Sequence, residues 1–310
     1  MKYEKLSKNP KQFLAMTGYT SEEFDSLLPY FEVRFSDELK RRTLTGNRRT
    51  GRGYGGYKNS PLPEPRDNLL FILIYLKQGM TRENLASLFG MHQPDANRRI
   101  HFLHPLLGGA LKDSGELPVR DAELLDFDNE KQHIFLHDGT ERPVVRPRDS
   151  DKQRLYFSGK KRWHSLKNIL ISDALCRVVF LSLTCEGKKH DKKAADEAGY
   201  GDCFPEGAVL LQDTGFQGFS AESARTVQPK KKPRGGELSE EEKERNRKIS
   251  GIRIRIEHVI SGVKRYRIVK DKIRNWKKGF RDTVMETCCG LHNFRLRFRP
   301  WTPVTVNESL

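Results

Sequence analysis

The stretch His133-Ile-Phe-Leu-His-Asp-Gly-Thr-Glu141 predicts a strand that carries an acidic residue to the edge of a sheet. A short apolar run of this kind is typical of a buried strand, and here it reaches Asp138 and stops at a glycine. Because side chains alternate along a strand, Asp138 shares its face with Ile134 and Leu136. The sequence therefore predicts a buried strand that ends in a carboxylate.

Two further acidic residues complete a set of three. The stretch Ala208-Val-Leu-Leu-Gln-Asp-Thr-Gly215 repeats the strand pattern and ends at Asp213. Glu257 lies at the edge of an apolar stripe with helical spacing in residues 252–263. Three carboxylates close together raise one another's pKa values unless a cation lies among them, and oxygen ligands suit magnesium or manganese. We therefore predict that these acids hold two Mg²⁺ or Mn²⁺ ions, an arrangement suited to phosphodiester displacement.

Four blocks of the sequence carry a resemblance to a known family. They are Asp138-Gly-Thr-Glu-Arg-Pro143, Tyr156-Phe-Ser-Gly-Lys-Lys-Arg-Trp-His164, Gln212-Asp-Thr-Gly-Phe216 and Arg253-Ile-Arg-Ile-Glu-His-Val259. In this order they resemble the DDE-superfamily transposases of bacterial insertion sequences, related to the Harbinger type. The resemblance implies an RNase H-like catalytic core, magnesium-dependent DNA cleavage and strand transfer. It also maps the family's acidic triad onto Asp138, Asp213 and Glu257.

The composition agrees with a nucleic-acid partner. The chain has 310 residues and a formal net charge of +16, with 57 Lys and Arg against 41 Asp and Glu, and such a balance favours a polyanion. No apolar run reaches the roughly 18 residues that span a bilayer, and the N-terminus lacks the apolar core of a signal peptide. We expect a cytoplasmic, nucleoid-associated protein with no membrane partner. Its five cysteines show no metal-ligand spacing and are expected to be reduced.

Residues 67–107 predict a helix-turn-helix. An apolar helix closes near Gly79, Thr81 caps a second helix, Gly90 makes a tight turn and Pro94 starts a third helix. A plain helical hairpin would give the same pattern. The third helix favours DNA recognition, because its first turns carry side chains that pair with adenine and guanine edges: Asn97, Arg98 and Arg99.

A basic segment follows the first predicted metal ligand. Residues 142–167 contain nine Arg or Lys against two Asp, interleaved with aromatic residues. This composition is either a solvated face or a phosphate-binding surface, and we favour the latter with Lys160, Lys161 and Arg162 as DNA contacts. Arg253 and Lys264 lie one and two turns from Glu257 on nearly the same side of its helix, where they would place positive charge beside the scissile phosphate.

Three aromatic residues are secondary candidates for the site. His164 and His190 match positions of the resembled family, although a lone histidine is more often structural. Trp163 could stack on an unpaired base, as could Trp276, for which a core position is the safer interpretation.

These observations predict an α+β chain: an N-terminal all-helical region with a helix-turn-helix, then an RNase H-like mixed α/β/α catalytic core. The expected parts are N-terminal helices and a basic arm at 1–60, the helix-turn-helix at 61–112 and the catalytic domain at 130–300. The predicted protein is a transposase that binds double-stranded DNA with terminal inverted repeats, cleaves it and joins it to target DNA. Its alternatives are a nuclease that only hydrolyses and a DNA-binding regulator without catalysis. A homodimer on DNA is expected, with contacts through residues 12–31 or from Phe280 onward.

Overall fold

The computed structural model describes residues 1–44, 46–51, 60–126, 133–275 and 277–306. Part of the predicted basic arm, the predicted start of the catalytic domain at residue 130 and Trp276 lie outside the described residues. The chain forms two compact units. Unit 1 contains Met1–Leu117, Lys264–Asp271 and Thr283–Phe298, and unit 2 contains Pro118–Val263, Lys272–Asp282 and Arg299–Leu310.

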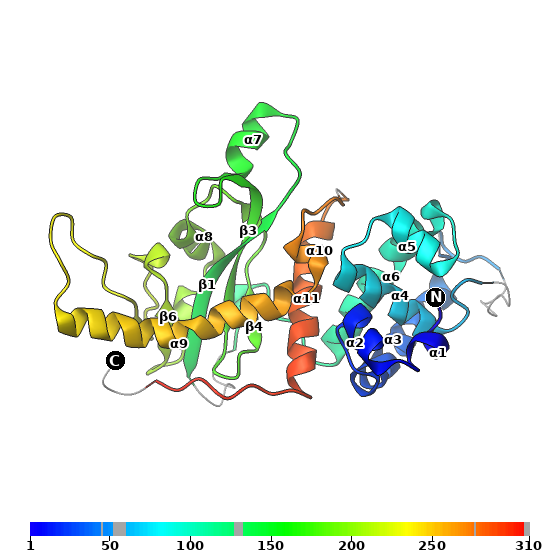
Figure 1. Cartoon of the computed structure of the whole chain (residues 1–310), viewed down its shortest axis with the longest axis horizontal. Helices are drawn as coiled ribbons and strands as arrows, with labels where there is room; N and C mark the ends of the chain where they lie inside the picture. Colours follow the sequence, from blue (N-terminus) through cyan, green and yellow to red (C-terminus); the bar gives the residue numbers. More distant parts are fainter. Residues whose placement is uncertain (45, 52–59, 127–132, 276, 307–310) are drawn as a thin grey trace. The chain divides into compact units, whose positions relative to one another are not determined.

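Unit 1 is helical (Figure 1). Its helices are α1 (Tyr3–Leu6), α2 (Pro10–Thr17), α3 (Ser21–Arg41), α4 (Pro65–Gln78), α5 (Arg82–Phe89), α6 (Gln93–Asp113), α10 (Arg267–Lys270) and most of α11 (Phe280–Leu296). A capping box opens α3, because the Glu23 amide donates to the Thr20 hydroxyl and the Thr20 amide donates to the Glu23 carboxylate. The side chains therefore fix where α3 begins.

The helix-turn-helix of unit 1 is confirmed at the predicted turns. Gly79 ends α4 and Gly90 ends α5, both in the left-handed conformation with φ of 60° and 65°. Thr81 caps α5 by accepting a hydrogen bond from the Asn84 amide. α6 then begins at Gln93, as the proline at its second position predicts.

The two segments that are candidates for dimer contacts also supply apolar side chains to the core of unit 1. Phe24, Leu27 and Phe31 of α3 are fully buried, and α3 packs against α4 and α6. The Tyr19 hydroxyl donates to the Leu291 carbonyl at 2.7 Å, which ties the N-terminal helices to α11. The apolar faces at 12–31 and in α11 are thus used within the monomer.

Unit 2 is built on a mixed sheet. Its elements are β1 (Ile134–Pro143), α7 (Ser150–Tyr156), β2 (Phe157–Ser158), β3 (Trp163–Ser172), β4 (Val178–Leu181), β5 (Cys185–Glu186), α8 (Asp191–Ala198), β6 (Val209–Gln212), β7 (Arg225–Val227) and α9 (Glu240–Lys264), with short 3-10 turns at Ala122–Leu124, Gly201–Cys203 and Thr214–Phe216. The strand order is β2-β3-β1-β6-β7, and β4 and β5 also pair with β3. β1 runs antiparallel to β3 and parallel to β6, and β6 runs parallel to β7.

Helices pack on both faces of this sheet. Phe135 and Leu210 belong to the apolar cluster that contains Ala194 and Ala195 of α8. Leu211 belongs to the cluster that contains Ile249 of α9. Neighbouring residues of a strand point to opposite faces, so α8 covers one face and α9, which runs across the strands in Figure 1, covers the other. The predicted α+β chain is confirmed, and the mixed sheet with its helices is consistent with an RNase H-like core.

The first strand is longer than predicted. β1 does not stop at Gly139 but continues to Pro143, because β3 pairs with it along its whole second half, from Asp138 opposite Leu170 to Pro143 opposite Ser165. The parallel partner β6 does end at the expected point, where His137 pairs with Gln212. Asp138 therefore lies at the end of the parallel ladder, but inside a strand.

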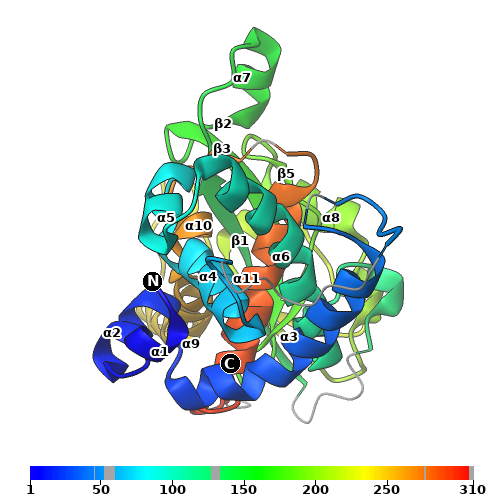
Figure 2. The ribbon, with the colours of Figure 1, turned by 90° about the vertical axis from the view of Figure 1, so that its right-hand side faces the viewer.

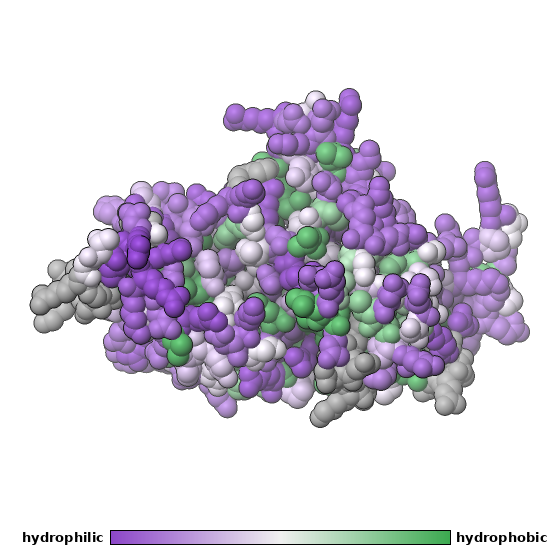
Figure 3. All heavy atoms as spheres, turned by 180° about the vertical axis from the view of Figure 1, so that it is seen from behind, coloured by the Kyte–Doolittle hydropathy of each residue, from purple (hydrophilic) through white to green (hydrophobic). Residues whose placement is uncertain are grey.

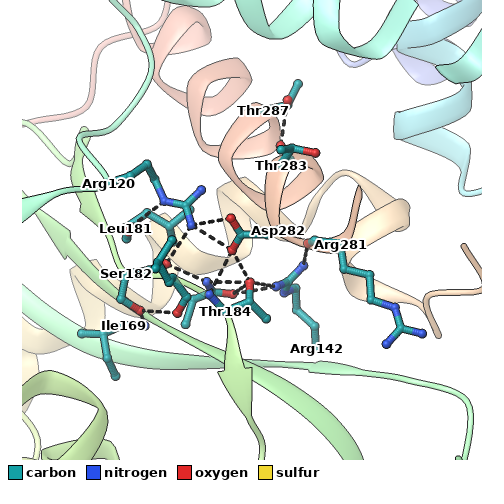
Figure 4. Close-up of polar contacts among 12 residues, drawn as sticks. Arg120, Arg142, Ile169, Leu181, Ser182, Thr184, Arg281, Asp282, Thr283 and Thr287 are labelled. Atoms are coloured by element: carbon teal, nitrogen blue, oxygen red, sulfur yellow. Dashed lines mark hydrogen bonds and ion pairs between the residues drawn. The ribbon is translucent and has the colours of Figure 1, made fainter. Parts of the chain in front are cut away.

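A buried polar network holds the start of α11 within unit 2 (Figure 4). Arg120 donates to both carboxylate oxygens of Asp282 at 2.8 Å, and Thr184 donates to the same carboxylate through its amide and hydroxyl. The fully buried Arg142 donates to Asn168, to Thr184 and to the Arg281 carbonyl. The arginine of the Asp138–Pro143 block is therefore a structural residue.

Candidate active site and nucleic-acid surface

Asp138 and Asp213 lie side by side where the parallel ladder of β1 and β6 ends. Both follow directly on the paired residues His137 and Gln212, and neighbouring strands are about 4.8 Å apart. Alternation places both carboxylates on the α9 face, together with Ile134, Val209 and Leu211. The two strand aspartates are therefore brought together as the sequence predicted.

The surroundings of Asp138 raise its pKa to about 6. Burial is the largest cause, and the nearby carboxylates of Asp213 and Asp191 act in the same direction. The Gly139 amide, which donates to Asp138 Oδ1 at 2.7 Å, and the charge of Arg253 oppose the shift. A cation beside this group would stabilise its ionised form.

Arg253 supplies positive charge at this point. Its Nη1 lies 3.2 Å from Asp213 Oδ1, and its side chain is only 12% exposed. It comes from α9, one turn before Glu257. Arg253 thus lies beside Asp213, while its predicted role at the scissile phosphate stays a prediction.

Glu257 is exposed on α9. Within the part of the chain that the structure describes, no group of three His, Cys, Asp or Glu side chains is gathered as a metal site. The arrangement unites two of the three predicted acids with Arg253. Two carboxylates that follow neighbouring strands, of which Asp138 has a pKa raised by burial and by the nearby carboxylates, nevertheless fit a hard divalent cation. Glu257 as a third ligand stays a prediction.

Sequence reasoning missed a fourth carboxylate, that of Asp191 at the start of α8. Lys167 Nζ lies 2.6 Å from Asp191 Oδ1 and also donates to the Lys189 carbonyl. A Cβ on Gly139 would lie 3.0 Å from Asp191 Oδ1, and one on Gly215 would lie 3.1 Å from Asp191 Oδ2. The glycines that follow the two strand acids therefore leave room for this carboxylate.

The histidines and tryptophan of the region have different environments. His137 is fully buried between Gln212 and the Tyr200 hydroxyl, and burial lowers its pKa to about 3, so it is a neutral structural residue. His190 is exposed at the start of α8. His164 packs edge-on against Phe157, with ring centroids 5.6 Å apart, and Trp163 is 46% exposed. None of the three secondary candidates is placed against Asp138 or Asp213 by these contacts.

The turn between β2 and β3 presents the predicted DNA-contacting cations. Ser158 pairs with Trp163, so residues 159–162 form the tip of a tight hairpin. Lys160, Lys161 and Arg162 are all exposed there. Arg162 adopts a φ of 55°, and its amide donates to the Ser158 carbonyl at 2.7 Å. The backbone thus holds three cations at one exposed turn.

The three candidates on α6 do not share one environment. Arg98 is exposed and pairs with Asp95. Asn97 is half-buried. Arg99 is only 8% exposed and donates to Asn68 Oδ1 at 3.2 Å and to Ser60 Oγ at 3.3 Å. Because it points into the helical unit, Arg99 packs α6 against α4, and base reading by this residue is not supported. Lys264 is the last residue of α9 and belongs to unit 1, so its place beside Glu257 stays a prediction.

Comparison with known families bears directly on this arrangement. The family of DDE superfamily endonucleases matches residues 137–293, which include both strand aspartates, Arg253 and Glu257. The chain belongs to the DDE superfamily of endonucleases. The helix-turn-helix of the same superfamily matches residues 60–113, which cover α4, α5 and α6. The helix-turn-helix interpretation is thereby confirmed over the plain helical hairpin.

Two relatives support the same membership. A protein of Microchaete diplosiphon named "Probable transposase for insertion sequence element IS702" is 26% identical over 302 residues, which cover 96% of this chain and all of the relative. A protein of Streptomyces albus G, with a similarly provisional name as the transposase for insertion sequence element IS112, is 27% identical over 207 residues, covering 66% of this chain and 71% of the relative. No solved structure matches the chain.

Endonucleases of the DDE superfamily generally depend on divalent metal ions. The pair of strand carboxylates fits this dependence, since it offers hard oxygen donors where a like-charge pair needs a cation. In the described part of the chain, no helix is long and apolar enough to cross a membrane, and the five cysteines form no disulfide.

Proposed function

We propose that this DDE superfamily endonuclease is a transposase that cleaves the ends of a DNA element and joins the freed 3′-hydroxyl groups to target DNA. The observation that carries the proposal is that Asp138 and Asp213 each follow the last residue pair of the parallel β1–β6 ladder, His137 and Gln212, with Arg253 at 3.2 Å from Asp213. The names of both relatives as insertion-sequence transposases support it. A relation to the Harbinger type stays a prediction.

Three acids would hold the metal. We propose that Asp138, Asp213 and Glu257 bind Mg²⁺ or Mn²⁺, with two ions per site. Ions bound there would stabilise the charge on the attacking and leaving oxygens of a phosphodiester. Arg253 has to exchange Asp213 for the scissile phosphate as a partner, and a guanidinium suits both because it pairs with carboxylate and phosphate oxygens alike. The chain's own contribution is therefore to orient the phosphate and to neutralise its charge.

DNA binding is assigned to two surfaces. The exposed Arg98 and the neighbouring Asn97 on α6 would read base edges in the terminal inverted repeats. Lys160, Lys161 and Arg162 at the β2–β3 turn would contact backbone phosphates, which position the DNA without reading its sequence. Both surfaces together account for a partner that is double-stranded DNA.

The test uses short duplexes taken from the DNA that flanks the gene, where the proposal places the terminal inverted repeats. The full-length protein with Mg²⁺ is expected to cut these duplexes at the element end. In a second assay, a duplex supplied already cut should be joined to a plasmid. Cutting without joining would leave only the hydrolytic nuclease, and binding without either reaction would leave only the catalytically inactive regulator.

The site assignment is tested by single substitutions. Asp138→Ala, Asp213→Ala and Glu257→Ala should each abolish cutting and weaken Mn²⁺ binding measured by calorimetry, while end binding stays within about twofold, because α6 is unchanged. Glu244→Ala is the matched control, since Glu244 is an exposed acid on the same helix as Glu257. Normal cutting by Glu257→Ala would remove that residue from the proposed ligands.

A further inference from the structure

A hollow of about 720 Å³ lies beside α7 and the β2–β3 hairpin of unit 2. Figures 1 and 2 both show α7 at the outer end of these strands. The cations Arg146, Arg154 and Lys188 line the hollow, together with Phe157 and His164. Its volume lies within the roughly 300 to 1,000 Å³ of ordinary small-ligand sites. The hollow therefore has room for one nucleotide.

The charge of this hollow is one-sided. No carboxylate is among the described residues that line it, and Arg146 is held in place by two hydrogen bonds to Gln153 Oε1, at 3.0 and 2.7 Å. A second cavity in unit 2, of about 740 Å³, mixes the acids Asp121, Glu123 and Glu197 with its cations. Of these two cavities, only the hollow beside α7 has the bias that an anionic ligand needs.

The same place exposes unusually apolar surface. Phe157 is 43% exposed although His164, its partner across the β2–β3 pair, packs against it. Other large apolar side chains that are exposed nearby in the sequence are Val145, Leu155 and Trp163. Residues 145–163 also hold seven Lys or Arg against two Asp. Figure 3 shows apolar surface within the otherwise hydrophilic tip that carries α7.

A surface that is both cationic and aromatic matches a ligand that is both anionic and flat. Duplex DNA satisfies only the first half of this match, because its bases are stacked and show no free face. An unpaired nucleotide satisfies both, since its base can stack on an aromatic ring while its phosphates lie beside cations. We propose that the hollow binds one unpaired nucleotide of a DNA strand, with the base against Phe157 and His164 and the phosphates beside Arg146, Arg154 and Lys188.

The identity of that strand rests on the proposed function. In a transposase that cuts element ends, the unpaired nucleotide would be at the cut end. The binding property itself does not depend on cutting and can be measured without it.

The experiment uses the full-length protein and a short thymidine oligonucleotide with one central 2-aminopurine, whose fluorescence falls when the base stacks on an aromatic ring. Wild type should quench the fluorescence. Phe157→Ala should reduce the affinity at least about fivefold, the lower limit for losing one stacking contact, and Phe157→Trp should retain it. Affinity for a fully paired duplex of the same length should stay unchanged in both variants.

A matched pair of variants tests the cations. Arg154→Ala removes a charge from the lining, whereas Arg148→Ala removes one from an exposed residue outside the lining. Arg154→Ala should weaken binding of the unpaired strand more than Arg148→Ala does. Equal losses would show attraction by general charge only and would overturn the proposal.

Two other results would also overturn it. One is unchanged quenching by Phe157→Ala. The other is a Phe157→Ala protein that binds the strand normally but loses self-association in light scattering, which would make this surface a protein interface. Cutting of end duplexes by wild type is measured in parallel. Failure of wild type to cut would refute the proposed function alone, whereas normal cutting with equal strand binding by Phe157→Ala would refute only this inference.

Discussion

The position of the Asp191 carboxylate depends on two residues that have no side chain. Gly139 and Gly215 leave the space that this carboxylate occupies, and Lys167 forms an ion pair with it. An alanine at position 139 would bring its Cβ to 3.0 Å from Asp191 Oδ1 and 3.2 Å from Asp191 Cγ. Because β1 is a strand of the sheet and α8 packs on the sheet, the contact can be relieved only by moving Asp191 or the strand that carries Asp138.

We therefore expect Gly139→Ala to lower the free energy of unfolding by roughly 1 to 3 kcal/mol, the usual cost of added volume in a packed site, and to reduce end cutting. Urea unfolding and the cutting assay are the measurements. Gly251→Ala, at a position with open space around its Cβ, is the control and should unfold no more easily than wild type. Equal stability of both variants would contradict the close approach of Asp191.

A second prediction at the scale of one residue concerns pH. His104 in unit 1 is 3% exposed and hydrogen-bonded to Thr287, and burial lowers its pKa from 6.5 to about 4. Between these values the unfolded chain binds a proton that the folded chain does not, so stability is lost as the pH falls from 6.5 towards 4. The loss amounts to roughly 3 kcal/mol when complete.

Chemical unfolding at several pH values measures this loss. His104→Gln cannot titrate and should show a smaller fall in stability over the same window. His92→Gln, which changes an exposed histidine, should keep the slope of wild type. A slope unaffected by His104→Gln would show that other groups control the acid sensitivity.

At the scale of the element, two consecutive residues of α6 have different expected roles. Arg98 is the proposed base contact, and Arg99 packs within unit 1. Arg98→Ala should leave stability within about 0.5 kcal/mol, as is usual for an exposed ion pair, and should weaken end binding by roughly 1 to 3 kcal/mol with relaxed preference at one base pair. Arg99→Ala should lower the free energy of unfolding by about 2 kcal/mol, because it leaves Asn68 and Ser60 without their charged donor. Footprinting and urea unfolding of the two proteins would detect the reverse outcome directly.

The elements that the sequence predicted well are those specified by adjacent residues. The cap at Thr81, the glycines at 79 and 90, and the start of α6 depend on side chains within a few positions, so local chemistry was enough. The predicted end of β1 was wrong because the second half of this strand pairs with β3, a partner distant in the sequence. The same cause hid the place of Asp191 and the burial of Arg99, since no local pattern states which helix packs against which face.

The candidate site follows the same division. Strand alternation was sufficient to place Asp138 and Asp213 on one face, because each aspartate follows an apolar run and shares the face of the alternate residues in that run. Strand alternation could not place Glu257, because the direction of a side chain on α9 depends on how that helix lies across the sheet. The pairing of Arg253 with Asp213 likewise required the packed structure.

At the scale of the whole molecule, the net charge of +16 leads to an expectation about how the chains associate. Like charges oppose association of the free chains, and DNA neutralises them. A transposase has to bring two ends together, and one site can act on only one scissile phosphate at a time. We expect a weakly associated protein in solution that pairs on DNA as a homodimer with two-fold symmetry, each subunit supplying one Asp138, Asp213 and Glu257 site.

Native mass spectrometry with and without short end duplexes tests this expectation. The predicted complex has two chains and two ends, and a mutant end without the inverted repeat should fail to pair. Because the apolar faces of α3 and α11 are already buried in unit 1, exposed surfaces have to form the contact. A complex of one chain per end under cutting conditions would refute pairing.

The division of unit 1 along the chain has a consequence for synthesis. Helices α1 to α6 are made first, but the residues that complete their packing, Lys264–Asp271 and Thr283–Phe298, are made only after every strand of the sheet. At bacterial or slower rates of translation, residues 118–263 take roughly 10 to 30 s to emerge. During this time Tyr19 has no Leu291 and His104 has no Thr287 to bond. In a nascent chain, unit 1 with its helix-turn-helix therefore completes its packing only after Asp138, Asp213 and Glu257 have all been made.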